Sequence, residues 1–312
     1  MTVVRVVAPA KVNLGLRVAA LRGDGYHQID TIFAALDLTD ALRVRIGPAA
    51  GAEPEVTGTI RADDPFVTAD LPPMDDANLA VRAARSWLAA SGARLDVRIE
   101  LDKRIPVAAG LGGGSSDAAA VLRGLETASD PVAAGRVERD PVDGAALAKR
   151  LGSDVPFFRS GLAAARGRGR GERLTERTLA PRALVLANPG VPVPVARAYE
   201  VLGGYGPPID WEALTRAWNE GETPPLRNDL QHGVFRIAPE VRAAWSALAE
   251  AGGRRAILSG SGGTSFALAD DAAHAERIAD ALRTAWPDWW VRAATAPVAP
   301  PPPESESLRP AR

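Results

Sequence analysis

Apolar and polar residues alternate along several stretches of the chain, a period of two that is typical of half-buried β-strands. Within residues 95–101, for example, the apolar positions are Leu95, Val97, Ile99 and Leu101. This pattern, or a short continuous apolar run, predicts strands over residues 2–7, 11–19, 32–38, 42–46, 95–101 and 183–188, and a strand–loop–strand over residues 257–269. Residues 53–73 are rich in Gly, Pro and Asp, which predicts loops around a short strand.

Other segments repeat their apolar residues at helical spacing. Leu79, Ala83, Trp87 and Ala90 predict a helix over residues 78–91. Helices are also predicted over residues 115–126, where serines would cap the start, and over residues 144–151, 211–219, 239–251 and 272–285.

The chain has 312 residues, too many for one small core, so two packed domains are expected. We place the first domain at residues 1–180 and the second, an α+β domain of alternating strands and helices, at residues 181–295. Residues 296–312 are rich in proline and polar residues, which predicts a disordered tail that cannot bury enough apolar surface to order itself.

Composition excludes several classes of function. A net charge of −1 gives no support to a nucleic-acid partner. The absence of cysteine excludes disulfides, thiolate metal sites and a cysteine nucleophile. No apolar run reaches membrane-spanning length and the N-terminus lacks a signal-peptide pattern, so we expect a cytoplasmic protein without a membrane partner. The basic repeat at residues 166–171 favours a solvated turn, near a nucleotide, over an RNA-binding tail.

A glycine cluster at residues 110–114 lies between the strand at residues 95–101 and the helix that follows. Glycines before a helix let the backbone approach a ligand, and the helix's unpaired N–H groups then favour an anion. A phosphate is the expected ligand, and a flexible turn without a ligand is the alternative. A Walker loop is excluded because no lysine follows before Lys149, and the dinucleotide pattern fails at Ser115.

The segment Pro-x-x-x-Gly-Leu-Gly-Gly-Gly-Ser-Ser-Asp-Ala, from Pro106, resembles the lysine-free ATP loop of the GHMP kinases (galactokinase, homoserine, mevalonate and phosphomevalonate kinases). Residues 8–16, Ala-Pro-Ala-Lys-Val-Asn-Leu-Gly-Leu, are similar to the first motif of that family, and residues 258–266 are similar to its third. The resemblance extends from about residue 6 to about residue 270. It implies an α+β fold with an N-terminal domain like ribosomal protein S5 domain 2 and a ferredoxin-like C-terminal domain.

By this resemblance the cofactors are ATP and Mg²⁺. The expected ATP-binding residues are Pro106, Val107, Ala108, Ala109, Gly110, Leu111, Gly112, Gly113, Gly114, Ser115 and Ser116. Ser115 and Ser116 could offer a hydroxyl to Mg²⁺, or could only cap the helix; we assign no protein metal ligand.

Asp154 and Lys11 are the candidate catalytic residues. Local sequence favours a turn or helix-capping role for Asp154 and a solvent-facing position for Lys11. The resemblance reverses both interpretations, because the family has its catalytic aspartate in a Gly-x-Asp-Val-Pro motif and its catalytic lysine in the first motif. Asp154 would then accept the hydroxyl proton, and Lys11 would orient it and stabilise the developing alkoxide.

Tyr26, His27 and Asn13 are the candidate substrate-binding residues. Together, residues 23–27 (Gly-Asp-Gly-Tyr-His) and 151–158 resemble family members whose acceptor is a cytidine diphosphate derivative. A tyrosine ring can stack on a pyrimidine and a histidine can bond its edge, although Tyr26 could instead pack on the core. Asn13 lies on the strand face of Lys11 and could bond the substrate or Asp154.

The sequence departs from the family pattern in residues 189–199. The family has a threonine where Val193 stands and an aromatic residue near Arg197 that stacks on the cytosine. Tyr199 could replace that aromatic only if the chain shifts locally. Asn228-Asp-Leu230 matches a family segment whose role the sequence does not define.

The sequence thus predicts an ATP-dependent kinase that phosphorylates a tertiary C2 hydroxyl of a cytidine diphosphate derivative, a small-molecule partner. A family kinase acting on homoserine or a mevalonate derivative is one alternative. A non-catalytic nucleotide-binding regulator is the other.

Overall fold

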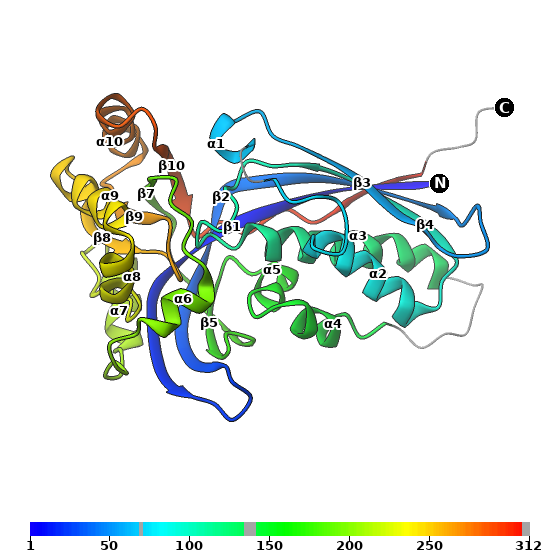
Figure 1. Ribbon diagram of the computed structural model, residues 1–312, viewed down its shortest axis with the longest axis horizontal. Helices are drawn as coiled ribbons and strands as arrows, with labels where there is room; N and C mark the ends of the chain where they lie inside the picture. Colours follow the sequence, from blue (N-terminus) through cyan, green and yellow to red (C-terminus); the bar gives the residue numbers. More distant parts are fainter. Residues whose placement is uncertain (69–70, 134–141, 308–312) are drawn as a thin grey trace.

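The computed structural model contains two β-sheets with helices packed on them, and it describes residues 1–68, 71–133 and 142–307 (Figure 1). Within these residues the larger sheet has seven strands: β1 (Thr2–Leu21), β2 (His27–Pro48), β3 (Val56–Arg61), β4 (Leu95–Asp102), β5 (Ala164–Gly169), β6 (Arg173–Glu176) and β11 (Glu304–Ser307). Its main path is β11-β1-β2-β4-β3, and β5 pairs with β2 and β6.

A long antiparallel hairpin of β1 and β2 organises the larger sheet. The strands predicted over residues 2–7 and 11–19 are one strand, and those over residues 32–38 and 42–46 also fuse. Residues 8–10, which the prediction left between the two strands, include Pro9, and a register irregularity between Pro9 and Lys11 accommodates this residue without an N–H group. The hairpin therefore carries Lys11 in its middle and Tyr26 at its tip.

Helices cover one face of this sheet (Figure 1). They are α2 (Leu79–Ser91), α3 (Gly113–Ala133), α4 (Gly144–Leu151) and α5 (Val155–Ser160); the short α1 is Pro65–Thr68. The helices predicted over residues 78–91 and 144–151 are confirmed as α2 and α4. Each has a side-chain cap: Asn78 accepts from the Ala80 N–H and Asp143 from the Ala146 N–H. Val121, Leu122 and Leu125 of α3 pack against the sheet in a buried apolar core.

The second sheet has four strands within the described residues, in the order β10-β7-β9-β8. They are β7 (Arg182–Asn188), β8 (Arg254–Leu258), β9 (Ser265–Leu268) and β10 (Trp290–Ala296), and all neighbours are antiparallel. Helices α9 (Pro239–Glu250) and α10 (Ala272–Ala285) pack on one face. This β-α-β-β-α-β order confirms the expected ferredoxin-like arrangement. The remaining helices are α6 (Val195–Glu200), α7 (Trp211–Asn219) and α8 (Gln231–Ile237).

A shared apolar core joins the two sheets. Leu186 and Phe266 of the smaller sheet, Leu14 and Ile32 of the long hairpin, and Trp218 of α7 belong to one buried cluster. The two-domain α+β fold is thus as expected, and we propose the division near residue 180, between β6 and β7. In the described part of the chain no helix is both long and apolar enough to span a bilayer.

The expectation that residues 296–312 form a disordered tail is wrong for Glu304–Ser307. These residues form β11, which pairs antiparallel with β1 from Thr2↔Ser307 to Arg5↔Glu304. The edge of β1 presents unpaired backbone groups there, and an added strand satisfies them without burying apolar side chains. Arg5 and Glu306 add an exposed ion pair of 3.4 Å. Residues 308–312 lie outside the described residues.

Candidate active site

A cavity of about 910 Å³ lies where the long hairpin, the glycine cluster and the segment after β7 meet. Its lining brings together most of the predicted site residues: Lys11, Asn13, Tyr26, His27, Pro106, Val107, Ala108, Ala109, Gly110, Gly112, Gly113, Gly114, Ser115 and Asp154. Leu111 is fully buried and Ser116 is 1% exposed, and neither lines the cavity. Segments far apart in the sequence thus form one site.

The glycine loop has a conformation that side chains would prevent. Gly110 and Gly112 have φ values of +77° and +74°, in the left-handed region that favours glycine. A Cβ on Gly110 would lie 2.4 Å from the Ser259 carbonyl oxygen, and one on Gly112 would lie 2.8 Å from the Phe158 ring. Ala108 also adopts a positive φ of 54°, a strain that occurs at ligand-binding loops.

Helix α3 begins at Gly113, two residues before the predicted start. The Ser116 N–H already donates to the Gly112 carbonyl, so the expectation that the serines precede the helix as its cap is wrong. The glycines themselves form the turn that opens the helix. Gly114 and Ser115 of the first turn line the cavity, where the free N–H groups and dipole of α3 favour an anion.

Lys11 lies inside the protein, with an exposed fraction of 3%. The solvent-facing alternative is therefore wrong. Its ammonium donates to the Asn13 side-chain oxygen at 2.7 Å and to the Gly110 carbonyl at 2.9 Å, and lies 3.7 Å from an Asp154 carboxylate oxygen. Burial lowers the pKa of Lys11, and the negative charge of Asp154 opposes that shift.

Asp154 precedes α5, but its side chain makes no capping hydrogen bond. The capping alternative is therefore wrong, and the carboxylate faces the cavity with 27% of the side chain exposed. Proline at the start of α5 and the buried Phe157 hold the backbone that carries it. The site thus offers a proton acceptor within reach of solvent and beside a buried cation.

Asn13 is held from both ends of its amide. Its oxygen accepts from Lys11, and its nitrogen donates to the Thr31 hydroxyl at 2.8 Å. The Thr31 hydroxyl in turn donates to the Gly15 carbonyl. This chain of bonds across the hairpin fixes the Asn13 rotamer and aims the Lys11 ammonium at Asp154.

Three aromatic rings gather at the hairpin end of the cavity. Tyr26 is 52% exposed, so the core-packing alternative is wrong. His27 stacks on Tyr199, with 4.7 Å between ring centroids and an angle of 18°. Burial, with a smaller contribution from Asp154, raises the pKa of Tyr199 to about 12, so its hydroxyl stays protonated. The structure thereby supplies an aromatic residue in the segment where the sequence departed from the family pattern.

Tyr199, which the sequence offered as a replacement for the family aromatic, lines the cavity. Val193 is buried against the core, and Arg197 faces solvent in an ion pair with Glu200. Helix α6 begins at Val195, after Pro194, and its turn carries Tyr199 back into the cavity. The Pro-x-Pro pattern before an apolar helix was the signal available in the sequence.

A buried charged cluster beneath the glycine loop was missed entirely. The Lys103 ammonium, 3% exposed, donates to Asp117 at 2.8 Å and to Asp40. Burial raises the pKa of Asp117 to about 7; Lys103 opposes this rise and Asp40 adds to it. The two carboxyl groups, of Asp40 and Asp117, share a single ammonium, that of Lys103. The cluster therefore has more acidic than basic side chains, next to a phosphate-binding loop.

The second glycine loop, residues 259–264, closes over the first. The Thr264 N–H donates to the Ala109 carbonyl at 3.0 Å, and the Ser259 hydroxyl donates to the Gly110 carbonyl at 3.1 Å. A Cβ on Gly260 would lie 3.0 Å from the Lys11 ammonium. Glycine is therefore needed where this loop passes the buried lysine.

The Asn228 side chain holds the second loop in place. Its amide nitrogen donates to the carbonyls of Leu258 and Gly260 at 2.9 and 2.8 Å, and Asn228 is 4% exposed. The flanking backbone bonds to Leu16 of β1. This family-like segment therefore ties the second loop to the strand that carries Lys11.

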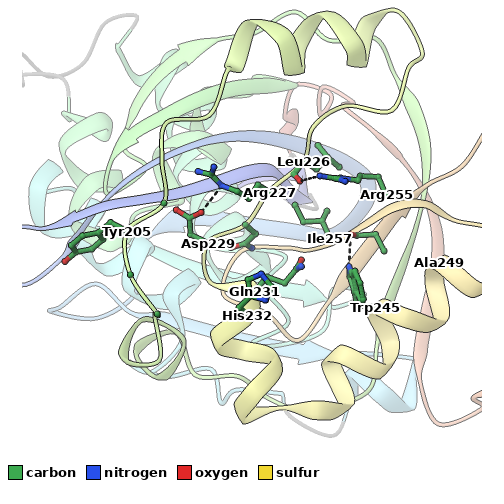
Figure 2. A pocket seen from close by; sticks show the side chains of 15 residues that line it. Tyr205, Leu226, Arg227, Asp229, Gln231, His232, Trp245, Ala249, Arg255 and Ile257 are labelled. Atoms are coloured by element: carbon green, nitrogen blue, oxygen red, sulfur yellow. Dashed lines mark hydrogen bonds and ion pairs between the residues drawn. The ribbon is translucent and has the colours of Figure 1, made fainter.

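A second cavity, of about 870 Å³, lies on the other side of this segment (Figure 2). Figure 2 shows Arg227 paired with Asp229, and Arg255 and Trp245 bonded to backbone carbonyls. These polar groups are thus satisfied within the protein, and the lining includes none of the residues predicted as functional.

Two family models match separate parts of the chain. The family described as "GHMP kinases N terminal domain" matches residues 78–161, and "GHMP kinases C terminal" matches residues 211–288. A 4-diphosphocytidyl-2-C-methyl-D-erythritol kinase from Deinococcus radiodurans is 44% identical over 92% of this chain and 91% of its own. The protein of that description from Thermus thermophilus is 42% identical over 91% of this chain and 94% of its own.

Solved structures give a consistent result. A crystal structure of 4-(cytidine 5'-diphospho)-2C-methyl-D-erythritol kinase superposes with a TM-score of 0.77 at 40% identity, covering 94% of this chain and 99% of that one. A homoserine kinase from Cytophaga hutchinsonii superposes with a TM-score of 0.61 at 17% identity, covering 97% of each chain. The second likeness shows the fold alone.

Proposed function

Because the chain belongs to the GHMP kinases, and among them to the 4-diphosphocytidyl-2-C-methyl-D-erythritol kinase family, we propose that it phosphorylates the C2 hydroxyl of that compound. ATP is the donor, and the products are the 2-phosphate and ADP, in the biosynthesis of isoprenoid precursors. The observation that carries the proposal is the pairing of Lys11 with Asp154 beside a glycine-lined helix start.

Asp154 acts as the general base. It accepts the proton of the C2 hydroxyl while the hydroxyl oxygen bonds to the γ-phosphorus of ATP and the bond from that phosphorus to the bridging oxygen breaks. Lys11 orients Asp154 and stabilises the charge that develops on the attacking oxygen. Two of the three Lys11 N–H groups donate to Asn13 and Gly110, and the ammonium forms an ion pair with Asp154. These contacts hold the ammonium beside the base.

The residues from Pro106 to Ser116 bind the ATP phosphates. Backbone N–H groups of the glycine loop and the start of α3 supply the donors, since this loop carries no lysine. Leu111 and Ser116 are buried and do not line the cavity, so their part is to support the loop.

Mg²⁺ accompanies the ATP. Among the described residues no group of three or more His, Asp or Glu side chains is arranged to hold a metal ion. Mg²⁺ in kinases is held largely by substrate phosphates and water, with one or two protein oxygens, and such a set fits this cavity. The Ser115 hydroxyl, in the first turn of α3 and on the cavity lining, would be the protein ligand. The metal when bound neutralises charge on the transferred phosphate.

Tyr26, His27 and Tyr199 bind the cytosine. The ring of Tyr26 is exposed at the cavity rim and that of Tyr199 is half-buried, which suits a base that enters from solvent. Asn13 contributes by orienting Lys11, with one of its two amide N–H groups left for the acceptor. The cytoplasmic location and the absence of nucleic-acid and membrane partners stay predictions.

The test is the variant Asp154→Asn, which keeps the shape of the side chain and removes the base. We expect turnover of the cytidine diphosphate acceptor to fall at least about 100-fold while ATP still binds. Wild-type activity on mevalonate or homoserine and none on the cytidine compound would contradict the proposal. Undiminished activity of the variant would remove Asp154 from its role.

A further inference from the structure

Arg170 lies in the turn between β5 and β6, at the rim of the active-site cavity. Its guanidinium carbon lies over the ring of Tyr26, 4.6 Å from the centroid. The guanidinium also donates to the Lys149 carbonyl at 3.2 Å. Arg170 therefore spans the distance between the hairpin tip and the end of α4, which leads to Asp154.

The three arginines of the basic repeat differ in their partners. Arg166 forms a two-pronged ion pair with Asp30 at 2.8 and 2.7 Å. Arg168 is exposed to solvent. Arg170 is half-buried, and among the residues described here no carboxylate oxygen lies within 4.0 Å of its guanidinium. Within this part of the chain Arg170 thus has no direct ion-pair partner on the wall of the cavity, and Asp24, whose charge interacts with that of Arg170, is already paired with Arg22 at 2.8 Å.

The turn itself is built to present this side chain. Gly169 and Gly171 have φ values of +79° and +115°, and a Cβ on Gly169 would lie 2.6 Å from the Glu172 carboxylate. That carboxylate accepts from the Arg170 backbone N–H at 2.6 Å, so it fixes the turn without pairing with the guanidinium. The side chain is thus held in place before any ligand arrives.

The position of Arg170 indicates which anion it meets. In the proposed substrate the base contacts Tyr26 and the reacting hydroxyl contacts Asp154, so the diphosphate that joins them must cross the space between these residues. The ATP phosphates lie instead at the start of α3. We propose that Arg170 binds the diphosphate of the acceptor substrate, an assignment that rests on the proposed function.

The chemistry of arginine suits this role. A planar guanidinium forms paired hydrogen bonds with phosphate oxygens while its face stacks on an aromatic ring. Stacking therefore holds the Tyr26 ring in position for the base and the Arg170 guanidinium in position for the diphosphate. Lysine would keep the charge but lose the flat contact and the paired bonds.

The experiment compares binding of cytidine and of cytidine diphosphate to the full chain by calorimetry. For the wild type we expect the diphosphate to bind more tightly than cytidine. The Arg170→Gln variant should lose about 10- to 100-fold in affinity for cytidine diphosphate, the range of a charged hydrogen-bonded pair, and less than about threefold for cytidine. Arg170→Lys should recover only part of the loss, and the matched control Arg168→Gln should match the wild type.

Steady-state kinetics provide the second measurement. We expect Arg170→Gln to raise KM for the acceptor by a similar factor and to leave KM for ATP unchanged. Equal losses for cytidine and cytidine diphosphate would overturn the proposal, because Arg170 would then only support Tyr26. A raised KM for ATP with an unchanged KM for the acceptor would also overturn it. A wild type that cannot phosphorylate the acceptor would instead contradict the proposed function.

Discussion

The Lys11 ammonium and the Asp154 carboxylate lie 3.7 Å apart, although they come from the first strand and from the turn before α5. Lys11 has one acceptor on its own strand, the Asn13 side-chain oxygen. Lys11 is buried in a strand whose other side chains are largely apolar, and Asp154 makes no capping bond. The ion pair between them therefore links the two side chains, and we expect the pair to act as one unit.

The variants Lys11→Met and Asp154→Asn test whether the two residues act as one unit. Each variant should lower kcat by at least about 100-fold, and the double variant should be no slower than the more damaged single one. Residues that act as a unit lose their joint effect when either is removed. Single-turnover rates with saturating ATP measure this. Losses that multiply in the double variant would mean that the two residues act independently.

Contact between the two glycine loops leads to a second prediction. Gly110→Ala would place a methyl group 2.4 Å from the Ser259 carbonyl oxygen, at a φ of +77°. The loops would have to separate, so we expect KM for ATP to rise at least about tenfold because the phosphate site loses its shape. Titration with ATP under acceptor saturation measures this.

Gly161→Ala provides the matched control for that variant. Gly161 has a similar φ of +70°, but a Cβ there would meet nothing within 4 Å. It should cost about 1–2 kcal/mol of unfolding free energy from backbone strain alone and leave KM for ATP unchanged. An equal effect of both alanines on KM would exclude the loop contact as the cause.

The buried cluster around Asp117 predicts a pH dependence of stability. Its folded pKa of about 7 lies above the ordinary value of 3.8, so the folded state holds a proton that the unfolded state releases. The stabilising contribution of that proton is present below about pH 4 and is lost as the pH rises through about 7. Asp117→Asn removes this titration.

Urea unfolding at pH 5 and pH 8 measures the effect. The stability of the wild type relative to Asp117→Asn should fall between the two pH values. Asp280→Asn, at an exposed carboxylate on α10, should leave the pH dependence unchanged. A difference between wild type and Asp117→Asn that is constant with pH would show that Asp117 is ionised throughout.

The position of Tyr199 leads to a fourth prediction. Its hydroxyl stays protonated at working pH, so the ring rather than the charge contributes to binding. Tyr199→Leu should raise KM for the acceptor by about 5- to 150-fold, the range for one aromatic–base stack, while Tyr199→Phe stays close to the wild type. KM for ATP serves as the internal control. A loss as large in the phenylalanine variant would assign the effect to the hydroxyl instead.

Local patterns predicted most elements because their apolar spacing and caps are themselves local. Helices α7 and α10 begin and end where the sequence predicted, each with an aspartate cap, at Asp210 and Asp271. Strand β11 was missed because its partner is the edge of β1, at the other end of the chain. A four-residue exposed strand carries no apolar signal of its own.

In the site, too, features set by local sequence were predictable, and features set by contacts between distant segments were not. The glycine loop was predictable because each glycine is required where it stands. The burial of Lys11 was not, since alternation along a strand does not reveal which face is covered. The cluster of Asp117 and Lys103 was missed because it depends on one contact, which forms only when the residue after β4 meets the start of α3 in the folded protein. Family resemblance supplied the Lys11–Asp154 pairing that periodicity could not.

Asn228 provides the last prediction, because one buried amide holds the second glycine loop against β1. Asn228→Ala leaves the carbonyls of Leu258 and Gly260 without their donor, at a cost of about 1–3 kcal/mol in unfolding free energy. The loop that shapes the Lys11 pocket then loosens, so kcat should fall about tenfold even well below the melting temperature. Asn219→Ala is the matched control: its amide also bonds two backbone groups, at Ala180 and Thr178, but on the surface. It should lower stability without changing kcat, and a wild-type kcat for Asn228→Ala would limit Asn228 to a role in stability.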